Sequence, residues 1–179
     1  MADLTEKKIF SEKIYQGRLL DVRKDEVRLP NGKTSTREWI NHPGAVCIIP
    51  ILPDKKIALI KQYRYPVLDH MIEIPAGKLE NNEEPLKCAE RELEEEIGYK
   101  AKKFTLLTHI HPAIGFANEK MWVYLAEDLE KTKSKLDQDE FVEFFPLELE
   151  DALQMIWGSK ITDVKTIIGL LWFARLKRS

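Results

Sequence analysis

A short strand, a tight turn and a strongly acidic helix follow one another between residues 71 and 98, and this order limits the fold more than any other feature of the sequence. Apolar residues recur every three or four positions in its second half, which predicts a helix from Asn82 to Ile97. Asn82 is expected to cap this helix and Gly98 to end it. One apolar stripe requires a sheet or a second helix to cover it. The predicted stripe consists of Leu86, Ala89, Leu93 and Ile97.

The polar face of the same helix brings three carboxylates together. Glu92, Glu95 and Glu96 are spaced i, i+3 and i+4, so their side chains share one face and repel one another. Arg91 lies one turn before Glu95 and can offset part of this charge. The oxygen-only donor set favours a hard divalent cation, Mg²⁺, Mn²⁺ or Ca²⁺, with the Ala76 carbonyl in the preceding turn as a further ligand. A solvated acidic helix without a metal is the alternative interpretation.

The spacing of these residues resembles the Nudix box. Gly77 is followed after five residues by Glu83, and after seven more by Arg91, which opens the run Arg-Glu-Leu-Glu-Glu-Glu-Ile-Gly. Every fixed position of the family pattern matches except the last, where Tyr99 replaces an aliphatic residue. The resemblance implies an α/β protein, namely the Nudix α/β/α sandwich with a mixed sheet, and an N-terminal antiparallel β extension.

The resemblance also implies roles for individual residues. Arg91 and Glu83 tie the helix to its loop. The catalytic base, which takes a proton from the attacking water, is expected to be Glu140 in a late acidic loop, with Glu95 and Asp139 as alternatives. The cofactor is Mg²⁺, or alternatively Mn²⁺. The implied metal ligands are Glu92, Glu96, the carbonyl of Ala76, and Glu95 as a ligand or close partner.

Segments outside the box resemble ADP-ribose pyrophosphatases and related nucleoside diphosphate sugar hydrolases. Residues 73–80 and 62–65 carry most of this likeness. It implies hydrolysis of a pyrophosphate bond to give a nucleoside monophosphate and a sugar phosphate. Those enzymes typically carry proline where Ile114 stands, so GDP-mannose or another pyrophosphate substrate is an alternative, and a Nudix-like module that only binds ligand is the non-enzymatic one. The implied substrate-binding residues are Arg37, Arg64, Glu38 and Glu119.

Extended patterns dominate the first 44 residues. Asn31-Gly32 between two such runs predicts a β-hairpin, because both residues tolerate positive φ. By resemblance, residues 1–44 are expected to form an N-terminal β region for dimerisation and the substrate pocket, and residues 45–179 the Nudix hydrolase domain. The expected assembly is a homodimer in which Arg37 helps to form the partner's pocket.

The remaining chain alternates strand and helix patterns. The continuous apolar run Ala45–Ile51 predicts a central strand. Further strands are expected at Ile57–Tyr63, Met71–Ile74, Phe104–Ile110, Met121–Leu125 and Phe141–Phe145, and helices around Leu149–Ile156 and Val164–Leu171.

Composition excludes several classes of function. The sequence holds 28 Lys and Arg residues against 30 Asp and Glu, so it lacks the basic excess typical of nucleic-acid-binding proteins. It shows no secretory signal and no apolar run long enough for a membrane helix, which together predict a cytoplasmic protein. Cys47 and Cys88 lie in apolar patterns with no histidine at metal spacing, and are predicted to be buried free thiols.

Overall fold

The computed structural model describes residues 2–133 and 141–178, and contacts divide the chain into two units. Unit 1 comprises Met1–Pro43 and Ala113–Lys120, and unit 2 comprises Gly44–Pro112 and Met121–Ser179. The segment 113–120 belongs to unit 1 because its backbone bonds to the end of β3: the Ile40 amide donates to the Phe116 carbonyl at 2.8 Å.

Unit 1 is built on one antiparallel sheet with the strand order β1-β2-β3. The turn from β2 to β3 confirms the predicted hairpin, but it spans five residues, and only Gly32, at φ +83°, has a left-handed backbone. The first strand was not predicted, because nine of its ten residues are exposed and the tenth is half-buried, so no burial pattern marks it. The strands are β1 (Lys7–Gln16), β2 (Asp21–Arg28) and β3 (Thr34–Ile40).

Unit 2 holds two sheets. The larger has the strand order β7-β4-β9-β8, and β4 and β9 run parallel while the other pairs are antiparallel, so the sheet is mixed. The smaller has the order β10-β5-β6. The larger sheet consists of β4 (Ala45–Pro50), β7 (Ala76–Lys78), β8 (Tyr99–Ile110) and β9 (Met121–Lys131), and the smaller of β5 (Ile57–Arg64), β6 (Asp69–Glu73) and β10 (Val142–Leu147), with the 3₁₀ turn η1 (Tyr65–Val67) between β5 and β6.

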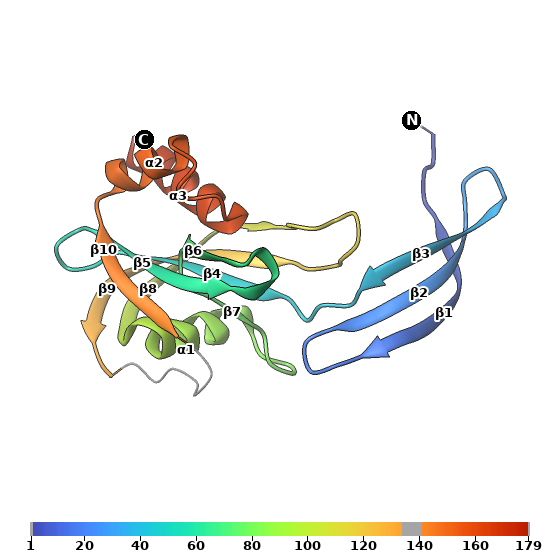
Figure 1. Cartoon of the computed structure of the whole chain (residues 1–179), viewed down its shortest axis with the longest axis horizontal. Coiled ribbons are helices and arrows are strands. Elements are labelled where there is room, and N and C mark those ends of the chain that lie inside the picture. The colour runs from blue at the N-terminus through green and yellow to red at the C-terminus, as the bar shows by residue number, and fades with distance from the viewer. Residues whose placement is uncertain (1, 134–140, 179) are drawn as a thin grey trace. The chain divides into compact units, whose positions relative to one another are not determined.

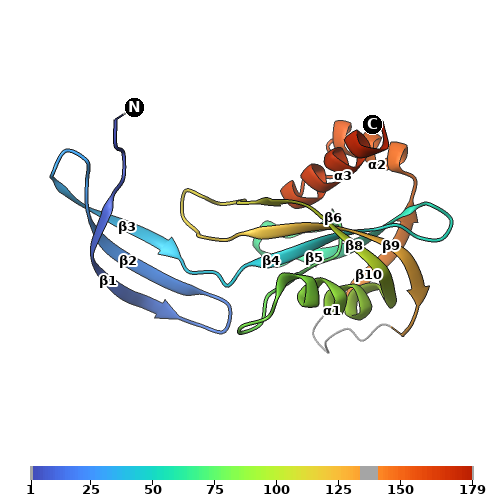
Figure 2. The ribbon, with the colours of Figure 1, turned by 180° about the vertical axis from the view of Figure 1, so that it is seen from behind.

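Helices cover both faces of this unit (Figure 1). Helix α1 (Pro85–Ile97) lies on one side, and α2 (Leu149–Trp157) and α3 (Val164–Lys177) lie on the other, as the view from behind also shows (Figure 2). The fully buried strand β4 serves both layers: Cys47 and Ile49 pack in the cluster that α2 and α3 cover, whereas Val46 and Ile48 pack with α1. The α/β/α layering and the central apolar strand are therefore confirmed.

Helix α1 differs from its prediction at its start. It begins at Pro85 with Glu84 as the N-cap residue, and Asn82 adopts a left-handed turn conformation at φ +60° before the helix. The predicted cap is wrong because Asn82 serves the turn instead. Leu86 is 40% exposed, and Cys88 takes its place in the buried stripe. Gly98 ends the helix as predicted, at φ +68°.

Both cysteines are buried and neither forms a disulfide bond, as the sequence predicts. Burial raises the pKa of the Cys88 thiol, and the carboxylate of Glu92 acts in the same direction. Within the described residues, every helix is too short or too polar to cross a membrane.

Candidate active site

The segment around Gly77, predicted as a tight turn, is the short strand β7 in the structure, where it pairs with β4, and it packs closely against the polar face of α1. A Cβ atom on Gly77 would lie 1.8 Å from both Cδ and Oε1 of Glu92. Only glycine therefore fits at this position while Glu92 keeps its place. This close approach explains why a glycine opens the acidic motif on physical grounds.

Arg91 is the centre of the charge network on α1. Its guanidinium contacts Glu83 twice at 3.0 Å, Glu92 at 2.7 Å and Glu95 at 2.9 Å. The hydrogen bonds from Arg91 lower the pKa of Glu83 to about 2. Three carboxylates against one guanidinium leave two negative charges in this network. The expected tie between Arg91 and Glu83 is thus present, since the loop carboxylate bonds directly to the helix.

The third predicted carboxylate, Glu96, lies one helical turn after Glu92 and faces strand β7. It is buried, with 7% of the residue exposed, and its Oε2 accepts a hydrogen bond from the Ala76 amide at 3.0 Å. The same backbone lies between β4 and α1, because Ala76 pairs with Cys47. Glu96 therefore contacts the Ala76 amide, and the predicted role of the Ala76 carbonyl as a metal ligand stays a prediction.

The donor chemistry of this region fits a hard divalent cation. All the candidate ligands are oxygen donors, and together they carry excess negative charge. Because Gly77 has no Cβ, the Glu92 carboxylate can lie against the backbone of β7. Within residues 2–133 and 141–178, no three His, Cys, Asp or Glu side chains stand in a metal-binding arrangement. In this structure Arg91 donates hydrogen bonds to Glu92 and Glu95, and Glu96 accepts one from the Ala76 amide.

Arg64, a predicted substrate ligand, ends β5 beside this region. Its Nε and Nη2 donate to the two oxygens of Glu73 at 2.6 and 2.7 Å, a bidentate pair. These bonds raise the pKa of Arg64, and the negative charge of Glu96 acts in the same direction. The Arg64 side chain remains 41% exposed, whereas that of Glu73 is 2% exposed. Glu73 therefore holds the edge of the guanidinium that carries Nε and Nη2, and the Arg64 side chain is partly exposed.

The other predicted substrate ligands belong to unit 1. Arg37 and Glu38 lie on exposed positions of β3, and Arg37 donates to Glu6 at 2.9 Å through Nε. Glu119 lies in the segment 113–120, where it forms a 3.8 Å ion pair with His42. These residues lie in unit 1, whereas the α1 carboxylates lie in unit 2.

The predicted catalytic base Glu140 lies outside the described residues, as does its alternative Asp139. Glu95, the third candidate, lies on α1, and its Oε2 accepts a hydrogen bond from Arg91.

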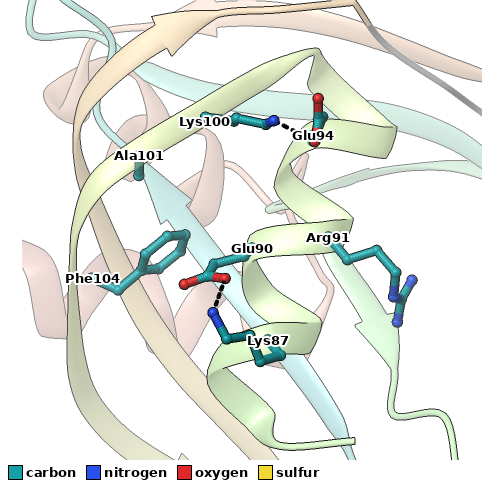
Figure 3. A pocket seen from close by; sticks show the side chains of 7 residues that line it. All are labelled: Lys87, Glu90, Arg91, Glu94, Lys100, Ala101 and Phe104. Atoms are coloured by element: carbon teal, nitrogen blue, oxygen red, sulfur yellow. Dashed lines mark hydrogen bonds and ion pairs between the residues drawn. The ribbon is translucent and has the colours of Figure 1, made fainter.

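A cavity of about 400 Å³ beside α1 does not coincide with this region. Its charged side chains pair with one another: Lys87 bonds to Glu90 at 2.7 Å, and Lys100 lies 3.3 Å from Glu94 (Figure 3). Arg91 points away from these pairs, toward the acidic network. The cavity therefore offers an anionic ligand little uncompensated charge.

Two residues of the region were missed by sequence reasoning. Glu73 was part of a recognised stretch but had no role, and Lys165 was not singled out. Lys165 is buried in α3, contacts Glu73, and lies 3.0 Å from Asp163. The available signal was a lysine two positions after the N-cap aspartate, at the start of a helix whose middle is apolar, because buried lysines require a partner.

Comparison with known proteins agrees with this geometry. Residues 41–163 match the NUDIX domain, and residues 6–40 match the nucleoside diphosphate sugar hydrolase N-terminal domain. An ADP-ribose pyrophosphatase of Bacillus subtilis is 47% identical over 95% of this chain and 93% of its own length. A methanol dehydrogenase activator of Bacillus methanolicus is 45% identical over 92% of this chain and 90% of its own length.

A solved structure supports the fold. The crystal structure of an ADP compounds hydrolase superposes with a TM-score of 0.86 at 21% identity, covering 98% of this chain and 96% of the other. Nudix hydrolases in general need a divalent metal ion, which agrees with the oxygen donors gathered on α1. The family match covers more than half of the chain and includes β7, α1 and the α1 carboxylates. The chain therefore belongs to the Nudix hydrolase family.

Proposed function

We propose that this protein hydrolyses the pyrophosphate bond of a nucleoside diphosphate sugar, with ADP-ribose as the first candidate and Mg²⁺ as the cofactor. The observation that carries the proposal is the packing of the α1 carboxylates against strand β7, with Glu92 against Gly77 and Glu96 on the Ala76 amide. The N-terminal family match and the ADP-ribose pyrophosphatase relative support the substrate class.

The reaction adds one water across the P–O–P bridge. The water oxygen forms a bond to one phosphorus, the bridging P–O bond breaks, and the products are a nucleoside monophosphate and a sugar phosphate. Glu92, Glu96 and the Ala76 carbonyl would hold Mg²⁺, with Glu95 as a ligand or close partner. The ion, when bound, supplies positive charge to the phosphate oxygens and acidifies water.

The chain's own groups bind the substrate and accept the proton. Arg64, whose side chain is partly exposed, would donate to the diphosphate through Nη1, the nitrogen that does not bond to Glu73. Glu140 takes the proton of the attacking water, because a carboxylate held as a metal ligand is a poor proton acceptor. Glu140→Gln should therefore lower kcat strongly and leave metal affinity unchanged. Wild-type kcat in Glu140→Gln, together with an inactive Glu95→Gln, would move the base to α1.

A homodimer completes the proposal. In unit 1, the apolar side chains Ile9, Phe10, Ile14 and Tyr15 of β1 are between 46% and 61% exposed. A three-stranded sheet needs cover for such a surface, and a second copy of the chain supplies it. Arg37, Glu38 and Glu119 then contribute to a substrate pocket shared between the two chains. The protein acts in the cytoplasm, where nucleotide sugars and Mg²⁺ are present.

A substrate panel tests the proposed function. The protein is incubated with Mg²⁺ and ADP-ribose, GDP-mannose, ATP or diadenosine polyphosphates, and products are separated by ion-exchange chromatography. We expect AMP and ribose 5-phosphate from ADP-ribose, at a kcat/KM above that of the other substrates. Preference for GDP-mannose would change the sugar nucleotide, and preference for ATP would refute the class.

A further inference from the structure

A single buried carboxylate is shared by two cations beside the candidate active site. Glu73 is 2% exposed and receives both arms of the Arg64 fork. Lys165, from the first turn of α3, forms an ion pair with the same carboxylate and is 9% exposed at its side chain. Burial alone would raise the pKa of Glu73, but the hydrogen bonds and charges of Arg64 and Lys165 outweigh it and lower the pKa.

The charges around Glu73 decide what Arg64 offers to a ligand. Arg64 and Glu73 alone sum to zero, so a fully compensated guanidinium would attract a diphosphate weakly. Lys165 adds one positive charge to this pair, which leaves the group at plus one. We propose that Lys165 is a positioning residue that keeps Arg64 available to an anionic substrate by compensating Glu73.

Asp163 could in principle cancel the effect of Lys165, since it lies 3.0 Å away. However, Asp163 caps α3: its Oδ2 accepts from the Thr166 amide at 3.0 Å and from the Thr166 hydroxyl at 2.6 Å. The amides of the helix N-terminus offset part of this negative charge. Lys165 therefore acts on Glu73 through their ion pair, and Asp163, whose charge like that of Glu96 also reaches Arg64, offsets only part of this effect.

The first turn of α3 also fixes the backbone beside Glu73. The Thr166 hydroxyl accepts a hydrogen bond from the Ile74 amide at 2.9 Å, and two residues later the Ala76 amide of β7 bonds to Glu96. This contact carries no charge, so it provides a way to separate anchoring from electrostatics. A variant that removes it should loosen the structure without changing the charge on Arg64.

Steady-state kinetics with ADP-ribose test the inference, which rests on the proposed function. Lys165→Met keeps the length of the side chain and removes its charge. We expect the KM for ADP-ribose to rise about tenfold, with kcat within about twofold of wild type. Calorimetry in EDTA, where no turnover occurs, should show the Kd for ADP-ribose rising by the same factor.

Two further variants separate the charge effect from a structural one. Lys165→Met combined with Glu73→Gln restores the net charge of the group, so KM should return most of the way to wild type. Thr166→Val keeps all charges, so it should lower Tm and leave KM unchanged. An unchanged KM in folded Lys165→Met, or no recovery in the double variant, would overturn the inference. A wild-type protein that neither binds nor hydrolyses ADP-ribose would instead overturn the proposed substrate.

Discussion

The two units of this chain differ in how they bury their apolar side chains and pair their charged ones. Unit 2 buries two apolar clusters, one on each face of β4, and directs its buried charges into defined pairs. Among the described residues of unit 1, only Val27 and Asp25 are buried, and apolar side chains of β1 stand exposed. Unit 2 therefore has a core that can hold catalytic side chains in place. The described residues of unit 1 form no such core, and we propose that polar contacts and a second chain stabilise this unit.

Removing a carboxylate from unit 2 should have the largest effect. Glu96→Gln keeps the hydrogen bond that the Ala76 amide donates but loses a ligand charge, so turnover with Mg²⁺ should fall on the order of a thousandfold. Glu94→Gln is the matched control, because Glu94 lies on the same helix but pairs with Lys100. Stopped assays for AMP and circular dichroism measure both variants. Near-normal turnover in Glu96→Gln would remove it from the metal site.

The next largest difference should come from adding one methyl group to a glycine, which we expect to impair unit 2 but not unit 1. Gly77→Ala places a Cβ where Glu92 lies, so the carboxylate must move and kcat/KM should fall about a hundredfold. Gly115 in unit 1 has no atom within 4 Å of its virtual Cβ, and Gly115→Ala should be neutral. The same kinetic assay compares both. Equal effects of the two substitutions would contradict the difference in packing between the units.

What the sequence could predict follows the same division. Helix α1, strand β4 and the Nudix box were predictable, because helical periodicity, apolar runs and motif spacing are local signals. Strand β1 was not, since its exposed side chains leave no burial pattern. The contact between Lys165 and Glu73 spans 92 positions, and no local pattern encodes such a pairing. The predicted helix cap at Asn82 was wrong because asparagine is equally suited to a turn, and Asn82 adopts a left-handed turn conformation here.

Charging the exposed face of β1 should break the proposed dimer. Phe10 is 61% exposed, and Phe10→Glu would place a carboxylate in the interface, which should weaken dimerisation about thirtyfold or more. Ile114, 82% exposed in the other segment of unit 1, is the control position, and Ile114→Glu should leave the dimer intact. Light scattering across a dilution series gives the mass. A wild-type monomer with full activity at micromolar concentration refutes the assembly.

A polar tie within unit 1 should give the smallest effect. Hydrogen bonds from Arg23, and then from Asn41, lower the pKa of Asp21 to about 2 from its usual 3.8. Because the folded pKa is depressed, the stabilisation is present above pH 3.8 and disappears as the pH falls through about 2. Asp21→Asn should thus lower the urea midpoint near pH 6, and the difference from wild type should shrink below pH 3.8. A difference that is constant with pH would show that Asp21 stabilises by shape alone.

A heterodimer tests most directly whether unit 1 of one chain serves unit 2 of another. Arg37→Ala and Glu96→Gln chains carry different affinity tags, are co-expressed, and the mixed dimer is purified for assay with ADP-ribose and Mg²⁺. If Arg37 completes the partner's pocket, both defects fall on one site and the other is intact. The mixed dimer should then show about half of the wild-type activity, although each homodimer is nearly inactive. Activity no higher than the mean of the two homodimers would show that Arg37 acts within its own chain, or not at all.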